Sequence, residues 1–376
     1  MMDNNLKFTR GGAELTIELL DKLQAATNTK NVLISPLSIQ TCMALAFTGA
    51  NGDTANEIAK VMKFVSNSPE EVADTFHNVL TDYEDSKLVK IANKIYIQEG
   101  HAIKPKYAAI TKEKFNAAAE NINFAENVVA AKNINNWVEE KTAGKISDLI
   151  PEYALDSDTR LVLLNALHFK GEWEEKFDPT HTNEDDFWLN ENESTKVQLM
   201  RKQGKFRFGY LRDYDCEALE MLYQDSDLSM FVLLPNKRNG LSAVADKLKG
   251  VNLLDLDQQL RTVENLIVKF PKFKIEYSAE LSNVMKEMGI IAAFGDADLS
   301  NLLEPSKGIS VSKIFHKTFI EVNEEGCEAA AATGFVCRKR CMPPQFTANS
   351  PFFYFIWNKK NILFAGAFVT PPKVAG

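Results

Sequence analysis

Residues 324–344 read EEGCEAAAATGFVCRKRCMPP and lie between two segments, 315–322 and 352–357, that are rich in apolar and β-branched residues. Such segments are typical of strands. A connection of about 25 residues inside a compact domain is unusual, and connections of that length are usually functional or disordered. From composition alone, a flexible surface loop is the simplest interpretation.

Two features of this loop favour a more specific interpretation. The four alanines, Ala329 to Ala332, are small enough to enter between existing strands without overpacking them. With the period of two that a strand requires, the odd-numbered face from Cys327 to Cys337 carries no charge. The segment therefore has the length of a loop and the pattern of a strand that can bury one face.

The basic triplet Arg338, Lys339 and Arg340 follows this alternating segment. It can be a solvated run of charge or, less well supported, a localisation patch. In an extended, exposed loop it is also a substrate for proteases whose specificity pocket holds an acidic residue.

The rest of the chain predicts one α+β domain spanning residues 1–376, because no linker or internal repeat divides it. Residues 161–169 form an apolar run interrupted by Asn165, which predicts a central strand buried on both faces. Ser35 and Pro36 occupy the N-cap and first-turn positions of a helix. Other predicted strands are 32–34, 88–97, 217–222, 230–234, 266–275, 315–322, 352–357 and 362–369. Helices are predicted at 36–49, 69–83, 104–115, 127–142, 240–248, 253–260 and 278–288, with one more around Leu15 to Leu23 and another starting at Asp53 or Thr54.

Composition excludes several classes of function. The net charge of −8 argues against nucleic-acid binding, which requires a basic face. Five scattered cysteines and five scattered histidines show neither a disulfide framework nor metal spacing, so no metal and no cofactor are expected. No apolar run reaches membrane-spanning length, and no hydrolase nucleophile motif stands out.

The loop resembles the reactive-centre loop of the serpins, the serine protease inhibitor superfamily. Further resemblances extend along nearly the whole chain. They comprise Ser35 to Ile39, Asn135 with Trp137 and Val138, Gly144 to Ile146, Leu163 to Ala166, Phe169 to Gly171, Trp173, Phe177, His316 with Lys317, Glu321 with Val322, Pro351 with Phe352, and Leu363 to Gly366.

The resemblance implies a serpin fold with three β-sheets, about nine helices and an exposed reactive-centre loop at about 324–347. It also implies suicide-substrate trapping, in which a protease is acylated and the cleaved loop inserts into the main sheet. The implied hinge residues are Glu324, Glu325, Gly326, Cys327, Glu328, Ala329, Ala330, Ala331, Ala332 and Thr333. In the family the cleaved residue lies fourteen positions after the hinge glycine, which is Arg340 here, before Cys341.

The resemblance further implies a group of residues that controls opening of the sheet. Ser35, Ser38, Asn165 and His316 match the family's shutter, and buried polar groups of this kind must pair with one another. The simpler alternatives are an N-cap for Ser35 and a satisfied core amide for Asn165. Trp173 and Lys272 match positions near the point where insertion begins, with core packing as the alternative for Trp173.

From these residues we expect an extracellular, monomeric inhibitor of trypsin-like serine proteases rather than an enzyme, acting through a covalent complex. A cytoplasmic location is the alternative. A dibasic-cutting proprotein convertase is the second choice of target, because Lys339 precedes Arg340. A non-inhibitory carrier or chaperone is the main rival, although such members often carry charge in the hinge.

Three further features stay open. Cys327 and Cys341 stand where the family usually has a small residue or a serine. A disulfide between Cys337 and Cys341 requires a turn, because four extended residues span about 13 Å and bridged Cα atoms lie within about 7 Å. A glycosaminoglycan site built from Lys60, Lys63, Lys87 and Lys90 is only weakly indicated.

Overall fold

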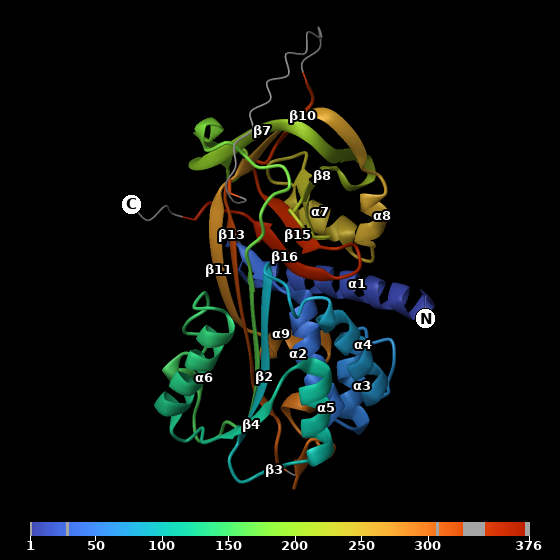
Figure 1. Cartoon of the computed structure of the whole chain (residues 1–376), viewed down its shortest axis with the longest axis vertical. Helices are drawn as coiled ribbons and strands as arrows, with labels where there is room; N and C mark the ends of the chain where they lie inside the picture. The colour runs from blue at the N-terminus through green and yellow to red at the C-terminus, as the bar shows by residue number, and fades with distance from the viewer. Residues whose placement is uncertain (1, 28–29, 306–307, 326–342, 373–376) are drawn as a thin grey trace. The chain divides into compact units, whose positions relative to one another are not determined.

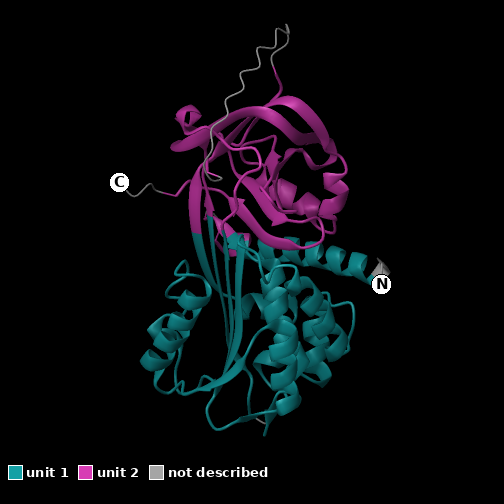
Figure 2. Ribbon diagram, viewed as in Figure 1, with its two compact units in different colours: residues 1–23, 33–169, 276–320 teal, residues 24–32, 170–275, 321–376 magenta. Residues whose placement is uncertain are grey.

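The structure is a computed structural model that describes residues 2–27, 30–305, 308–325 and 343–372 (Figure 1). The chain divides into two compact units, each assembled from three separate segments (Figure 2). Unit 1 comprises residues 1–23, 33–169 and 276–320, and unit 2 comprises 24–32, 170–275 and 321–376. Helix α1 and strands β1, β11 and β13 contribute residues to both units.

Unit 1 contains most of the helices and the central part of a five-stranded sheet. The strand order of this sheet is β11-β13-β5-β2-β4. The helices and strands of unit 1 are α1 (Met2–Thr27), α2 (Pro36–Gly49), α3 (Gly52–Val61), α4 (Pro69–Thr81), β2 (Val89–Gln98), β3 (Ala102–Ile103), α5 (Pro105–Phe115), β4 (Ala119–Ile122), α6 (Asn127–Lys141), β5 (Leu161–Phe169), α9 (Ser282–Met288), β12 (Leu303–Glu304) and β13 (Val311–Val322). The short strands β3 and β12 pair as a separate two-stranded sheet.

Strand β5 is buried along its whole length because helices cover both faces of the sheet. The even-numbered face, with Val162, Leu164 and Ala166, packs against Ile134 and Val138 of α6. Helix α2 lies on the opposite side of the strands, as Figure 1 shows. This double cover explains why the sequence of β5 is apolar throughout, and it confirms the predicted central strand.

Unit 2 is dominated by antiparallel strands. The nine-stranded sheet has the order β1-β16-β15-β9-β8-β7-β10-β14, and β6 pairs with β7. The elements are β1 (Val32–Ile34), β6 (Asn183–Trp188), β7 (Ser194–Leu211), β8 (Cys216–Leu222), β9 (Ser229–Pro235), α7 (Leu241–Leu248), α8 (Leu253–Asp257), β10 (Arg261–Pro271), β11 (Phe273–Glu280), β14 (Gln345–Thr347), β15 (Phe352–Trp357) and β16 (Ile362–Phe368).

The sequence-based element assignments differ from the structure in several places. The single strand predicted at 266–275 is two strands, β10 and β11, separated at Lys272. The helix predicted at 278–288 begins only at Ser282, because β11 continues to Glu280. The 18-residue strand β7 was not predicted, since its solvent-facing positions carry many lysines and arginines.

The described residues therefore form an α+β protein with three sheets and nine α-helices, which confirms the predicted fold class. The predicted reactive-centre loop falls mainly outside the described residues.

Candidate functional site: a polar row in the sheet and an anchored hinge

Three polar residues lie side by side across three neighbouring strands of unit 1. His316 of β13 pairs in register with Asn165 of β5, and Asn165 pairs in register with Asn93 of β2. Asn165 and His316 are fully buried, and Asn93 is nearly so. Because directly opposite residues project from the same face of a sheet, the strand register itself brings the three side chains together.

Ser35 and Ser38, at the start of α2, complete this polar row. The backbone N–H of Ser35 donates to Nε2 of His316 at 3.2 Å. The side-chain amide of Asn165 donates both to Oγ of Ser38 and to Oδ1 of Asn93. Oγ of Ser38 in turn donates to Asn93 at 3.4 Å. The predicted shutter residues of unit 1 thus form one connected hydrogen-bond network.

Ser35 also has the simpler role that the sequence indicated. Its side chain accepts a hydrogen bond from the backbone N–H of Ser38 at 3.3 Å and caps α2, with Pro36 at the first helical position. The N-cap and the network are therefore compatible, because the cap uses the hydroxyl of Ser35 and the network uses its backbone N–H.

The network fixes His316 in its neutral form. Nε2 accepts from Ser35, so the ring proton resides on Nδ1, which contacts Oδ1 of Asn165. Burial lowers the pKa of His316 to about 3, because a charged imidazolium is poorly solvated there. The ring is therefore a permanent hydrogen-bonding connector at neutral pH.

Asn93 is the member of the polar row that the sequence analysis did not identify. It lies inside the predicted strand 88–97, and an asparagine within such a strand indicates a buried polar group that needs a partner. Its partner was not visible, because assigning Asn93 to Asn165 requires the register of two strands that are far apart in the chain.

Trp173, in unit 2, holds the backbone just after β13. Its indole Nε1 donates to the backbone carbonyl of Asn323 at 3.0 Å. The indole is buried and stacks on Tyr223, with ring centroids 4.6 Å apart and ring planes inclined by 13°. Trp173 therefore packs in the core and also bonds to Asn323, the residue directly before Glu324.

Glu324 is the first predicted hinge residue, and the structure anchors it firmly. Its carboxylate is 2.8 Å from Nζ of Lys272 and accepts a 2.7 Å hydrogen bond from the hydroxyl of Thr182. Burial alone would raise the pKa of this carboxyl, but the bonds from Lys272 and Thr182 hold it below its ordinary value. Glu324 is thus a buried, charged anchor, whereas Glu325 next to it is exposed.

The remaining residues of the predicted hinge and of the predicted cleavage site lie outside the described residues. These are Gly326, Cys327, Glu328, Ala329, Ala330, Ala331, Ala332, Thr333, Cys337, Arg338, Lys339, Arg340 and Cys341. The C-terminal boundary of the predicted loop differs from the structure. Residues Gln345–Thr347 form β14, which pairs in parallel with β10.

The other candidate ligand groups of the sequence show little organisation among the described residues. No cluster of histidine, cysteine and acidic residues there can hold a metal ion. None of the described helices is both long and apolar enough to span a membrane. Of the four lysines considered for a glycosaminoglycan, Lys63 pairs with Glu14 and Glu18, and Lys90 donates to the Ser86 carbonyl.

The polar row lies beneath two strands that run in the same direction. β13 and β5 are direct neighbours from Val311 to Ile320 and pair in parallel. A strand that turned back after Glu324 and entered between them would be antiparallel to both, and antiparallel pairing is slightly more stable per residue. The arrangement therefore suits a sheet that can gain one strand at this seam.

Comparison with known proteins places this architecture in a family. The sequence model of the serpin (serine protease inhibitor) family matches residues 10–371. Serine protease inhibitor 42Dd of Drosophila melanogaster is 37% identical, over 97% of this chain and 98% of its own. Serpin B4 of Homo sapiens is 38% identical, over 91% and 94%.

Solved structures agree. A cleaved Serpin 42Da superimposes with a TM-score of 0.89 at 40% identity, covering 98% of this chain and 99% of its own. A complex of human thyroxine-binding globulin gives a TM-score of 0.89 at 25% identity, over 98% and 100%. This chain is a member of the serpin family.

Proposed function

We propose that this serpin inhibits trypsin-like serine endopeptidases as a suicide substrate, cleaved between Arg340 and Cys341, and is not itself an enzyme. The protease serine Oγ attacks the carbonyl carbon of Arg340. The bond to the nitrogen of Cys341 breaks, the new amine takes the proton, and an ester joins Arg340 to the protease. Insertion of residues 326–340 then moves the ester before water can hydrolyse it.

The direct parallel pairing of β13 with β5 is the observation that carries this proposal. The two strands of this seam are joined by their backbone ladder and by the contact of His316 with Asn165, and Asn165 extends the network to Asn93 on β2. At the end of β13, Asn323 and Glu324 are held by Trp173 and Lys272, where the returning strand would start. About fourteen residues in extended form reach about 46 Å, enough to carry an attached protease a long way from its starting position.

The sequence of the loop supports the choice of target. Arg340 is both the position that family spacing implies and the last basic residue of the triplet. A proprotein convertase is the second candidate, since Lys339 precedes Arg340. It is less favoured, because Cys337 stands where those enzymes usually select a basic residue. We also propose an extracellular site of action, with the cytoplasm as the alternative.

A non-inhibitory role is the alternative from a different class of function. Thyroxine-binding globulin shares the fold, so the fold alone does not select inhibition. The alanine-rich segment 329–332 and the charge-free odd face from Cys327 to Cys337 favour insertion, because a charge buried in the seam would oppose it strongly.

Incubation with trypsin followed by denaturing electrophoresis tests the proposal. We expect a band that withstands denaturation at the summed mass of the two proteins, absent with Arg340→Ala. Ala331→Glu is a matched control, since it leaves the proposed cleavage site intact but places a charge on the face that would be buried on insertion. This variant should be cleaved without forming the complex. Cleavage of the wild-type chain without any stable complex would contradict the proposal.

A further inference from the structure

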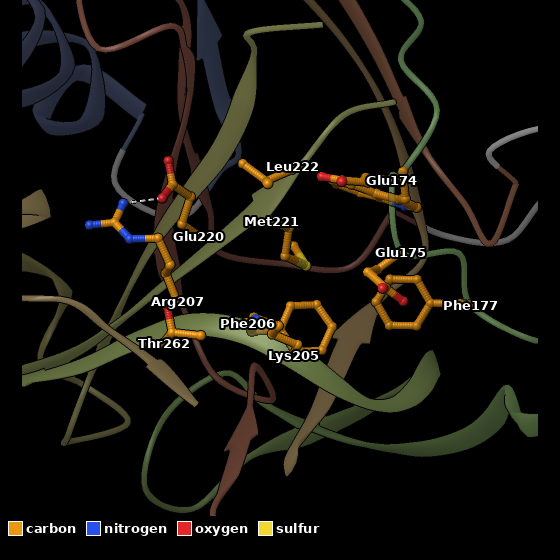
Figure 3. A pocket seen from close by; sticks show the side chains of 11 residues that line it. Glu174, Glu175, Phe177, Lys205, Phe206, Arg207, Glu220, Met221, Leu222 and Thr262 are labelled. Carbon is orange, nitrogen blue, oxygen red and sulfur yellow. Dashed lines mark hydrogen bonds and ion pairs between the residues drawn. The ribbon is translucent and has the colours of Figure 1, made fainter. Parts of the chain in front are cut away.

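A pocket of ≈ 290 Å³ lies inside unit 2, next to the anchored hinge (Figure 3). Its apolar lining consists of Trp173, Phe177, Phe206, Met221 and Leu222. Its volume is near the lower end of the range for small-molecule sites, and such sites combine an apolar body with a few polar groups. The pocket therefore has the size and lining for a small aromatic ligand.

The charged groups around the pocket are unequally neutralised. Arg207 and Lys359 together pair with Glu220 and Asp257. Lys205 pairs with Glu264 at 3.1 Å. Glu175 pairs with Lys202 at 2.6 Å. Among the described residues, Glu174 is the lining carboxylate with no ion-pair partner. The uncompensated charge at the pocket is therefore negative, which favours a cation.

The arrangement of these groups suits a molecule that is aromatic at one part and cationic at another. Figure 3 shows Met221 and Phe206 between the Arg207–Glu220 pair on one side and Glu174 with Glu175 on the other. Met221, Phe206 and Glu174 all line this one pocket, so an aromatic body placed on Met221 and Phe206 and an ammonium group placed at Glu174 belong to the same ligand. Aromatic side chains nearby add cation–π attraction.

The pocket is also physically joined to the hinge. Trp173 is one of the lining residues, and its indole donates to the carbonyl of Asn323. Asn323 directly precedes the anchored Glu324. A ligand that rests on Trp173 contacts a side chain whose hydrogen bond must be altered if the chain after β13 changes conformation.

We infer that this pocket binds small aromatic amines, and that the bound amine stabilises the hinge in its described conformation and slows loop insertion. The second half rests on the proposed function. A ligand shifts an equilibrium by its difference in affinity for the two states, and the coupling is reciprocal. Slower insertion gives the acyl-enzyme more time to hydrolyse, so more inhibitor is consumed for each protease molecule trapped.

Binding is tested by isothermal calorimetry with tryptamine, using 3-ethylindole as the uncharged analogue. We expect tryptamine to bind three- to fivefold more tightly than 3-ethylindole, the ratio typical of one partly exposed ion pair. Glu174→Gln should remove that ratio and leave 3-ethylindole unaffected. Glu191→Gln, at an exposed glutamate that does not line the pocket, is the matched control and should behave as wild type.

Two variants test the location and the coupling. Met221→Trp should fill the pocket and abolish binding of both compounds. Since that change can disturb the core, Thr262→Lys provides a second probe. It adds a cation at an exposed lining position and should weaken the binding of tryptamine more than the binding of 3-ethylindole. Failure of tryptamine to bind at millimolar concentration, or binding unaffected by Glu174→Gln, would overturn the assignment.

Coupling is measured as the number of inhibitor molecules consumed per trypsin inactivated. Saturating tryptamine should raise this number at least twofold in the wild type and leave it unchanged in Met221→Trp, which also controls for any effect of the amine on trypsin. Trp173→Phe keeps an aromatic wall but removes the bond to Asn323, so it should still bind the amine without the change in stoichiometry. Tryptamine binding with no change in wild-type stoichiometry would overturn the coupling. Absence of any trypsin trapping would instead refute the proposed function, while calorimetry still decides whether the pocket binds amines.

Discussion

Glu324 and Lys272 form a 2.8 Å ion pair directly after β13, with the carboxylate almost entirely buried and the ammonium half exposed. The pair holds the chain at the first residue of the proposed hinge. Because Glu324 retains its charge through Lys272 and Thr182, removing either partner leaves a poorly solvated carboxylate rather than a free one.

Lys272→Ala should destabilise the described state by about 1 kcal/mol, a modest value because Lys272 is half exposed. For a chain of this size, that corresponds to a fall of about 1–3 °C in the thermal midpoint. Scanning calorimetry measures the change. Lys272→Arg preserves the ion pair, so its thermal midpoint should stay near that of the wild type. If the Lys272→Ala protein unfolds at the same temperature as the wild type, the pair does not hold the hinge.

Asn165→Ala should lower the free energy of unfolding far more than Ser35→Ala. The first change removes one hydrogen-bond partner from each of His316, Ser38 and Asn93. Ser38 and Asn93 keep their bond to each other, whereas Nδ1 of His316 loses its partner. Because a buried group without a partner costs about 1–3 kcal/mol, we expect a loss of about 2–4 kcal/mol. Ser35→Ala removes one N-cap acceptor, worth about 1 kcal/mol, and keeps the backbone donor to His316. Urea denaturation followed by circular dichroism compares them. Equal losses would mean that Asn165 is not the centre of the network.

His316 should make stability depend on pH in the acid range. Its pKa is about 3 in the folded protein and about 6.5 in an unfolded chain, so the unfolded state binds the proton first as pH falls. The stabilising contribution is complete above about pH 7 and declines by about 1.4 kcal/mol per pH unit between pH 6 and pH 4.

The variant His316→Gln isolates this contribution. Glutamine is neutral at every pH. The wild type should therefore lose stability relative to the variant as the pH falls from 7 to 4. Urea midpoints at several pH values give the difference. A difference that does not vary over this range would show that His316 is not the titrating group.

Gly366 of β16 faces the buried ring of Tyr354 on β15. A Cβ atom at this position would overlap that ring, which cannot move out of the core, so Gly366→Ala should cost about 1–3 kcal/mol or more through overpacking. Gly12→Ala in α1 meets only a contact at 3.6 Å and should be neutral or slightly stabilising. Thermal denaturation distinguishes them, and a tolerated Gly366→Ala would contradict the close packing of β15 on β16.

Features with a local signal could be predicted from the sequence. The apolar run of β5, the Ser35–Pro36 helix start and the polar residues Asn165 and His316 all have such signals. Features that depend on strand pairing could not. Asn93 acquires its role only through its register with Asn165. The apolar character of residues 266–275 continues across the break at Lys272, so one strand was predicted where two exist.

The pocket in unit 2 could not be predicted either. Its lining comes from the segment after β5 and from β7, β8 and β10, and its charge follows from which carboxylates find partners. Trp173 carried a family signal. Its simultaneous contacts with Tyr223 and Asn323 required the three-dimensional arrangement.

The central claim is that cleavage after Arg340 leaves the protease covalently attached to the inserted loop. Intact-mass spectrometry of a trypsin reaction tests it most directly. The account predicts one species with the mass of trypsin plus residues 1–340 joined by an ester, together with a released peptide of residues 341–376 when the products are denatured. A chain cut after Arg340 with trypsin unmodified, or a cut at another bond, would contradict it.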